Sequence, residues 1–313
     1  MVVFSSNKHL EHLLHANYWV MDGTFRSAPS IVTQIYAIHA AVNQRWFPLV
    51  IALMQRKCKE SYKALFQVLK SEVRRRFRRN LAPDHISTDF EQAAISAAEE
   101  EFEDTEIEDC IFHLGQTFWR RMQGEGLASE YTNENNEQLR SDFRSLLALA
   151  FVPQEDVPDV FDQLAADAVG DLALVFDYVE DNYVRGRRRG RGRSRPMFPP
   201  RLWNCYTRVL EELPRTTNTC EAWHRRLNIL VGKHHPSLFV FLDQIQEEVG
   251  VIDFQMDRGH GGESPPKKRK KYEDLDTRIL RIVSRYGDYK ERNDVLTYLR
   301  SIGHNLAGNI IVN

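Results

Sequence analysis

Clusters of apolar residues predict three strands near the start of the chain. Residues 18–26, 31–42 and 46–55 are rich in aromatic and β-branched side chains, which favour extended backbone. Ala28-Pro29 separates the first two segments, and the sequence NQR at 43–45 separates the last two as a hairpin turn. We therefore expect these strands to form an antiparallel meander.

Helical spacing replaces the strand pattern after the third segment. A helix is predicted over residues 60–77 because the apolar side chains there recur at helical intervals, namely Tyr62, Leu65, Phe66, Leu69 and Val73. A short strand at 85–89, a helix at 90–102, a strand at 108–114 and a helix at 115–123 are predicted next. This order of elements favours an α/β fold, with helices on the faces of a mixed sheet.

The middle of the chain is predicted to be helical throughout, with helices at 139–150, 157–164 and 172–179. A loop of arginine and glycine at 186–196 interrupts these helices, and another helical pattern covers 215–231. The composition then changes to Gly, Pro and Lys between 257 and 271, which is typical of a flexible linker. A helical pattern over 273–299 follows it.

These patterns divide the chain into five expected parts. They are a first part of the core at 1–128, a helical insertion with the arginine-glycine loop at 129–214, a helix completing the core at 215–250, a flexible basic linker at 251–272 and a helical tail at 273–313. The tail is too short for a stable domain and would have to pack on the core or on a second subunit.

Composition indicates a globular protein of the cell interior. Of the 313 residues, 42% are apolar and 27% are charged, and the net charge is −2, which is typical of a folded soluble chain. No apolar run is long enough to span a membrane, and no secretory signal precedes the first strand. The four cysteines are widely spaced and form no CxxC pair, which argues against a disulfide scaffold or a zinc ribbon.

Two aspartates lie at strand positions where a carboxylate is unusual. Asp22 interrupts the apolar stretch NYWVMDGTFR, and Asp89 follows the strand HIST directly before a helix. Burial of a carboxylate is costly unless a partner compensates it, and strand ends in open α/β sheets are where ligands commonly bind. Gly23 is expected to let backbone or substrate approach Asp22 closely.

A third carboxylate, Glu221, lies in the helical stretch TTNTCEAWHRRLN, which Thr216, Thr217 or Asn218 could cap. Two aspartates and a glutamate supply the hard oxygen ligands that Mg²⁺ and Mn²⁺ prefer. Each residue also has an ordinary interpretation, since Asp89 could be a helix N-cap and Glu221 a solvated helix residue.

Four segments in this order resemble the transposase domain of Mutator-like elements, the MULE family. They are DGTF at 22–25, STDFE at 87–91, CIFHLGQ at 110–116 and RTTNTCEAWHRRLN at 215–228, and the resemblance covers about residues 1–250. It implies a ribonuclease-H-like fold with an acidic DDE triad and an all-helical insertion before the glutamate. By this resemblance Asp22, Asp89 and Glu221 are the catalytic residues and the ligands of two divalent ions, Mg²⁺ or Mn²⁺.

The resemblance also suggests neighbours of that site. Cys110 and His113 match the CxxH signature of the family, although Cys110 could equally be a core thiol. His224 lies three residues after Glu221 and therefore shares its helix face, but it could be a surface histidine. Asn218 is a further expected neighbour at the start of the same helix.

Two basic segments are predicted to contact nucleic acid, because arginine binds phosphate bidentately and releases counterions. The residues concerned are Arg74, Arg75, Arg76, Arg185, Arg187, Arg188, Arg189, Arg191 and Arg193. The alternative for the second segment is a disordered solubilising loop or an RNA-binding segment. The sequence PPKKRKK, with its basic residues Lys267, Lys268, Arg269, Lys270 and Lys271, is a nuclear-localisation pattern, so we expect the nucleus as the compartment.

The leading hypothesis is a DDE-type transposase domain that cleaves and joins DNA by phosphoryl transfer with two metal ions. Its partners would be transposon ends and target DNA, and it would assemble as a homo-oligomer on that DNA. One alternative is a domesticated or degenerate element that binds nucleic acid without catalysis. Another is a nuclease acting on RNA–DNA hybrids. No N-terminal DNA-recognition module is apparent, so a further segment or a second protein would recognise the DNA ends.

Overall fold

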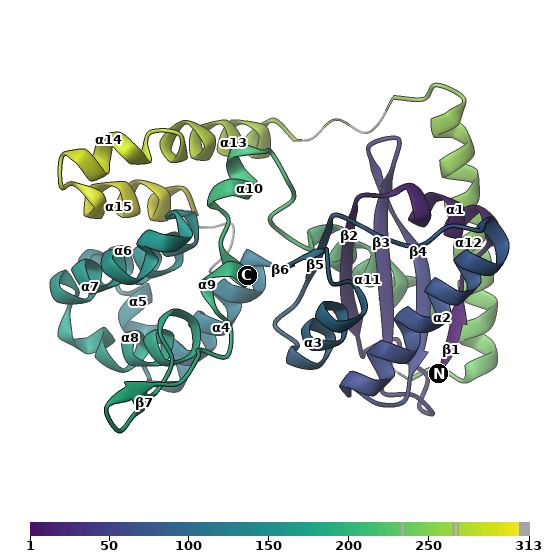
Figure 1. Ribbon diagram of the computed structural model, residues 1–313, viewed down its shortest axis with the longest axis horizontal. Coiled ribbons are helices and arrows are strands. Elements are labelled where there is room, and N and C mark those ends of the chain that lie inside the picture. The colour runs from purple at the N-terminus through teal and green to yellow at the C-terminus, as the bar shows by residue number, and fades with distance from the viewer. Residues whose placement is uncertain (233–234, 265–266, 268, 307–313) are drawn as a thin grey trace. The chain divides into compact units, whose positions relative to one another are not determined.

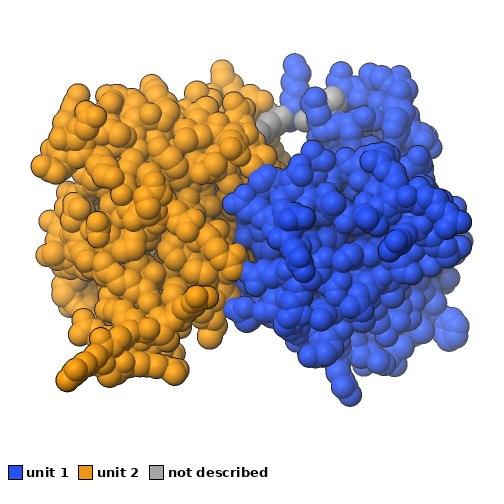
Figure 2. All heavy atoms as spheres, in the orientation of Figure 1, with its two compact units in different colours: residues 1–108, 216–267 blue, residues 109–215, 268–313 orange. Residues whose placement is uncertain are grey.

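The computed structural model describes residues 1–232, 235–264, 267 and 269–306. The chain divides into two units that alternate along the sequence (Figure 2). Unit 1 comprises Met1–Glu108 and Thr216–Lys267, and unit 2 comprises Asp109–Arg215 and Lys268–Asn313. The sequence-based division differs in two places, because residues 109–128 and the helical tail both belong to unit 2.

A mixed six-stranded sheet forms the centre of unit 1 (Figure 1), which confirms the predicted fold class. The strand order is β1-β4-β3-β2-β5-β6. Strands β1 to β4 pair antiparallel, whereas β2 and β5 pair parallel. The bounds are Val2–Phe4 for β1, Tyr18–Thr24 for β2, Gln34–Val42 for β3, Arg45–Met54 for β4, His85–Thr88 for β5 and Glu106–Asp109 for β6.

The predicted hairpin between β3 and β4 is present and is tighter than expected. Val42 pairs with Arg45, which leaves Asn43 and Gln44 as a two-residue loop. Both loop residues have positive φ, 51° and 62°, as a type I′ turn requires. This turn matches the twist of the flanking strands and fixes the register of the meander.

Helices cover both faces of the sheet. On one face lie α2 (Lys59–Phe77) and α3 (Gln92–Glu101), where Tyr36 of β3 contacts Tyr62 and Trp19 of β2 contacts Phe102. On the other face lie α11 (Asn218–Val231) and α12 (Leu238–His260). The short helix α1 (Asn7–His15) contacts α2 and also α12, to which His9 is bonded through Asp253.

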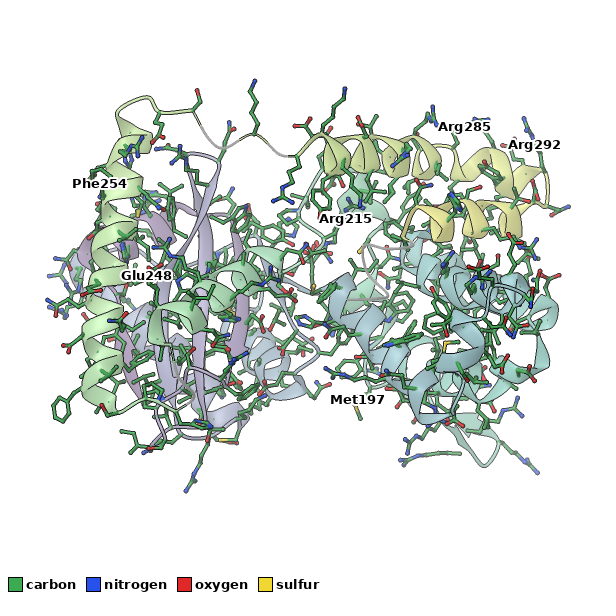
Figure 3. The ribbon with its side chains drawn as sticks, turned by 180° about the vertical axis from the view of Figure 1, so that it is seen from behind. Met197, Arg215, Glu248, Phe254, Arg285 and Arg292 are labelled. Atoms are coloured by element: carbon green, nitrogen blue, oxygen red, sulfur yellow. The ribbon has the colours of Figure 1, made fainter. Side chains whose placement is uncertain are left out.

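The core beneath α11 and α12 joins distant parts of the chain. It consists of Ala28, Ile35, Ala37, Ile51, Leu53, Trp223, Leu227, Val231, Phe241 and Ile245. Glu248 of α12 connects the two helices (Figure 3), since it accepts a hydrogen bond from Trp223 Nε1 at 3.2 Å and lies 2.8 Å from Arg226. Burial raises the pKa of Glu248, and Arg226 opposes that shift.

In the part of unit 2 that the structure describes, helices predominate and a single small hairpin provides the strands. Its α-helices are α4 (Ile111–Gly124), α5 (Ala128–Thr132), α6 (Glu137–Ala148), α7 (Val157–Asp167), α8 (Ala173–Val179), α9 (Pro200–Trp203), α10 (Tyr206–Leu210), α13 (Lys270–Val283), α14 (Tyr286–Glu291) and α15 (Val295–Leu306). Short helical turns are η1 (Leu149–Phe151), η2 (Gln154–Asp156), η3 (Gly170–Leu172) and the π-helical η4 (Glu180–Val184), and the hairpin strands are β7 (Arg188–Arg189) and β8 (Gly192–Arg193).

The C-terminal tail is an integral part of unit 2. Helix α15 packs on α6 and α13, and Tyr298 is fully buried and donates a hydrogen bond to the carbonyl of Phe151. Tyr286 donates to Asp156 at 2.9 Å, and Lys290 contacts the same carboxylate. Up to Leu306, the tail therefore buries its main apolar side chains within unit 2.

Several predicted boundaries are wrong for identifiable reasons. The strand predicted at 108–114 ends at Asp109, and α4 begins at Ile111, because Ile111, Leu114 and Phe118 continue a buried helical stripe. The linker predicted from residue 257 begins later, since α12 extends to His260. The tail contains three helices instead of one. Neither β1 nor α1 was predicted.

All four cysteines are free thiols, and three of them, Cys110, Cys205 and Cys220, are buried. Within the described ranges, no helix is both long and apolar enough to cross a membrane. The thiols therefore contribute as small apolar side chains or as hydrogen-bonding groups within the two cores.

We expect Phe241→Ala to lower the free energy of unfolding by about 3–5 kcal/mol, because it empties a fully buried position under the sheet. Phe239→Ala is the matched control, since Phe239 lies on the same helix and is 79% exposed, and it should change stability by less than about 0.5 kcal/mol. Urea denaturation followed by tryptophan fluorescence measures both. Equal losses in the two variants would contradict the packing described.

Candidate active site

The parallel register of β2 and β5 brings Asp22 and Asp89 to the same end of the sheet. Val20 of β2 is paired with Ser87 of β5, and each aspartate lies two residues further along its chain. Side chains two residues apart point to the same face of a sheet. Asp22 therefore extends toward the face that α11 and α12 cover, whereas the Asp89 carboxylate, just beyond the end of β5, lies beside Thr88, whose hydroxyl is close to that of Tyr36 on the opposite face.

Asp22 is buried, with 5% of its surface exposed. It is paired across the sheet with Ala37, a member of the core beneath α11. Its Oδ1 accepts the Gly23 amide hydrogen at 2.8 Å, and its Oδ2 lies 3.6 Å from Nδ1 of His224. The carboxylate thus faces a titratable side chain on α11, as the cost of burying it requires.

Asp89 is half-buried and lies just beyond the end of β5. Its backbone carbonyl accepts the Glu91 amide hydrogen at 2.7 Å, and Thr88 Oγ1 lies 3.4 Å from its Oδ1. The N-cap of α3 is Glu91, so the helix-cap interpretation does not describe Asp89. Glu91 is itself held by the Tyr62 hydroxyl at 2.6 Å and by Lys57 at 2.8 Å, which fixes the segment that follows Asp89.

Helix α11 carries the third carboxylate. Its inward stripe of Cys220, Trp223, Leu227 and Val231 is buried against the sheet. Glu221 lies in the first turn and is half-buried. It is one turn from His224, which contacts Asp22, so the two side chains share a helix face.

A buried thiol and imidazole join α11 to the sheet. Cys220 Sγ lies 3.0 Å from Nδ1 of His39 on β3 and 3.6 Å from the carbonyl oxygen of Val20 on β2. Burial holds the pKa of His39 well below its usual value, and the nearby His224 lowers it further, so the imidazole is neutral. The sequence analysis missed His39, although a histidine within the apolar run QIYAIHAAV was a usable signal.

Gly23 lies at a close contact between β2 and β3. A Cβ atom at this position would lie 2.7 Å from Oε1 of Gln34, whose Nε2 donates a hydrogen bond to the hydroxyl of Tyr62 on α2. The close approach therefore occurs on the face of the sheet opposite Asp22. Glycine is needed there for packing between β2 and the layer of α2.

The donor set suits a hard divalent cation. Asp22, Asp89 and Glu221 offer carboxylate oxygens from β2, the end of β5 and α11, all in unit 1. Such oxygens are the preferred ligands of Mg²⁺ and Mn²⁺. A buried Asp22 beside a histidine is consistent with a site that compensates negative charge.

The other expected neighbours are located differently. Cys110 is buried directly before α4, and His113 is half-buried in the first turn of that helix. Both belong to unit 2, whereas the three carboxylates belong to unit 1. Asn218 is exposed at the first residue of α11.

A second cluster of potential metal ligands was not predicted. His85, Glu106 and Glu108 place one ligand atom each within 4.8 Å of one another. His85 begins β5, four residues before Asp89, so this cluster lies at the opposite end of the strand. A lone histidine and an acidic strand gave no recognisable motif, which is why sequence reasoning missed it.

The arginines of the 185–195 segment fall into two groups. Arg185 forms ion pairs with Asp162 and Glu180, and Arg193 pairs with Glu180 and donates to the carbonyl of Gly186. These two side chains hold the base of the β7–β8 hairpin. The remaining arginines of the hairpin, Arg187, Arg188, Arg189 and Arg191, are exposed.

The first basic segment lies at the end of α2. Arg74, Arg75 and Arg76 are exposed there, and both Arg75 and Arg76 are paired with Glu72. Its positive charge is therefore partly compensated. In the predicted nuclear-localisation segment, Lys267 and Arg269 are exposed, as are Lys270 and Lys271 in the first turn of α13, whereas Lys268 lies outside the described residues.

Comparison with known protein families gives one match. Residues 18–117 match the family model of the MULE transposase domain. This segment, about a third of the chain, contains Asp22, Asp89, Cys110 and His113 and ends before Glu221. The match confirms the predicted relation to MULE transposase domains for this segment. No curated protein matches the chain.

Acidification should destabilise the protein through His39. The unfolded chain takes up a proton near pH 6.5, whereas the folded state with its lowered pKa does not, so stability is lost as the pH falls below that value. Below that pH, the free energy of unfolding of the wild type should decrease with each pH unit by more than that of His39→Gln. The difference between the two slopes should be at most about 1.4 kcal/mol per pH unit.

The control is His15→Gln, which replaces an exposed histidine at the end of α1 and should keep the wild-type slope. Denaturant titrations at a series of pH values between 7.5 and 5 give the slopes. Identical slopes for the wild type and His39→Gln would show that another group controls the acid response.

Proposed function

We propose that the chain is a DDE-type transposase domain that cleaves and joins DNA by metal-dependent phosphoryl transfer. The observation that carries this proposal is the placement of two of the acidic residues at the same end of neighbouring strands, with the helix that bears the third packed on one of these strands. Asp22 and Asp89 extend from adjacent parallel strands, and α11, which bears Glu221, packs over β2. The match of residues 18–117 to the MULE transposase domain supports the assignment.

The topology supports a ribonuclease-H-like core. Three antiparallel strands, β2, β3 and β4, are followed by β5 and β6 on the other side of β2. A helical unit is then inserted before α11, as the resemblance implies. Strand β1 is an addition at the edge beside β4.

In this proposal Asp22, Asp89 and Glu221 hold two Mg²⁺ or Mn²⁺ ions. Such ions, when bound, supply charge stabilisation at the phosphate and activation of the attacking oxygen. The carboxylates would position the metal ions and would not themselves attack phosphorus, so no covalent enzyme intermediate is required. His224 would hold the Asp22 carboxylate in place. The contact between His39 and Cys220 would fix the position of α11 along the sheet, and with it the position of Glu221.

The attacking groups would be water in the cleavage step and a freed 3′ hydroxyl in the joining step. Each attack forms a new P–O bond and breaks the bond to the leaving oxygen; the attacking water or hydroxyl gives up a proton to solvent, and the leaving oxygen takes one up. DNA would be bound through sequence-independent phosphate contacts of the exposed hairpin arginines. Because the joining step brings two DNA ends together, the protein would act as a homo-oligomer on DNA. The basic segment at 267–271 would direct it to the nucleus.

The second candidate is a transposase-derived protein that binds nucleic acid without cleaving it. One observation favours it, since the family match ends before α11 and so leaves Glu221 outside. Nucleic-acid binding by the β7–β8 hairpin does not depend on that residue. The two candidates differ only in metal-dependent cleavage.

Asp89→Asn should reduce Mn²⁺-dependent nicking of supercoiled DNA by about a hundredfold or more, because it removes a charged ligand from the reaction centre. Asp84→Asn is the control, since Asp84 is exposed just before the other end of β5, and it should keep wild-type activity. If Asp89→Asn nicked DNA as fast as the wild type, the assignment of Asp22, Asp89 and Glu221 as a catalytic triad would be contradicted. Tight, salt-sensitive binding by a wild type that never cleaves would favour the second candidate.

Replacing Arg188 and Arg189 with glutamine should weaken DNA binding and reduce its salt dependence. Loss of two phosphate contacts lowers the slope of log K against log salt concentration by about 2. The matched control replaces Arg285 and Arg292, two exposed arginines elsewhere in unit 2 (Figure 3). Fluorescence anisotropy over a range of salt concentrations gives both slopes, and equal slopes would contradict a role for the hairpin.

A further inference from the structure

The cluster of His85, Glu106 and Glu108 lies well away from the proposed catalytic carboxylates. His85 and Asp89 are four residues apart on an extended segment, a distance of about 13 Å. Glu106 and Glu108 alternate on β6, the hydrogen-bonded neighbour of β5, so their side chains share a face. One ion could not be bound by both groups of residues.

The distances within the cluster fit metal coordination better than direct hydrogen bonding. Nδ1 of His85 lies 3.3 Å from Oε1 of Glu108 and 3.6 Å from Oε2 of Glu106. Hydrogen bonds from nitrogen to oxygen are usually 2.7–3.2 Å. Ligands about 2.1 Å from a tetrahedral zinc ion are about 3.4 Å apart. Within the described part of the chain, the buried Nδ1 atom forms no hydrogen bond.

The charges in the cluster also favour a cation. The side chain of Glu108 is only 2% exposed, and that of Glu106 is 64% exposed. Two carboxylates beside a single imidazole leave excess negative charge even when the imidazole is protonated, and burial makes such an excess costly. A divalent ion would compensate it, and the exposed Glu106 side chain can adjust to complete the coordination.

Tyr18 orients two of the three ligands. Its hydroxyl donates to Oε2 of Glu108, so that Oε1 faces His85. Its ring stacks on the imidazole of His85 with 5.4 Å between centroids. Partners that fix the orientation of ligating side chains in this way are characteristic of metal sites.

We propose that His85, Glu106 and Glu108 bind one zinc-type divalent ion, separate from the ions of the proposed catalytic centre. Imidazole together with carboxylate is a ligand set that zinc accepts, and three protein ligands leave one position for water. The ion would join β5 to β6, two strands of only four residues each. It would thereby stabilise the part of the sheet from which Asp89 extends.

Isothermal titration of the full chain, stripped of metal, with Zn²⁺ alone tests this proposal. The wild type should bind one zinc ion at this cluster, besides any zinc at the proposed catalytic carboxylates, and His85→Ala and Glu106→Gln should each lower the affinity of the cluster at least tenfold. Glu106→Gln changes a mostly exposed side chain, so it reports on binding even where His85→Ala fails to fold. His15→Ala is the control for loss of an exposed histidine and should bind as the wild type does.

Asp22→Asn and Asp89→Asn separate this proposal from the proposed function. They should leave the zinc affinity of the cluster unchanged even where they abolish DNA cleavage. Zn²⁺ should also raise the melting temperature of the wild type but not that of Glu106→Gln. Unchanged zinc affinity in both cluster variants, or loss of the site in Asp89→Asn, would overturn the proposal.

Discussion

The parallel pairing of β2 with β5 is the contact on which the candidate active site depends. Antiparallel neighbours would place the ends of these strands at opposite edges, whereas the parallel register brings Asp22 and Asp89 to the same end of the sheet. A shift of one residue would move every side chain of β5 to the other face of the sheet, because side chains alternate along a strand. The register is secured by the buried residues on both faces of the sheet, Trp19 toward α3 and Val20 toward α11. The placement of the candidate site and the packing of the core therefore depend on the same residues.

Helix α11 has to return to this sheet after a long excursion of the chain through unit 2. Its apolar stripe supplies most of the contact area, but an apolar stripe can slide along a sheet at little cost. The polar contacts of Cys220 with His39 and of Trp223 with Glu248 are directional, and each requires one position of the helix. We infer that these contacts determine the position of the helix, while burial of Leu227 and Val231 supplies the free energy that holds it on the sheet.

Much of the sheet could be predicted from the sequence because its strands are long and apolar. The meander follows from apolar runs rich in aromatic and β-branched residues, and the helix at Lys59–Phe77 follows from apolar residues at a period of 3.6. The segment after Asp109 was misread because a short apolar run fits strand and helix equally well. The aspartates were found because carboxylates are conspicuous in apolar strands. His39 and the cluster at His85 were not found because their partners are far away in the sequence, at Cys220 and on β6.

The interleaving of the two units has a consequence for synthesis of the protein on the ribosome. The sheet is complete once β6 has emerged, but α11 follows only after roughly one hundred further residues. At about 5–20 residues per second, that interval lasts roughly 5–20 s. Throughout it Ile35, Ala37, Ile51 and Leu53 present an uncovered apolar face, and such surfaces are prone to aggregation. The nascent chain is thus an expected client of chaperones, and a truncation before residue 218 would be insoluble for the same reason.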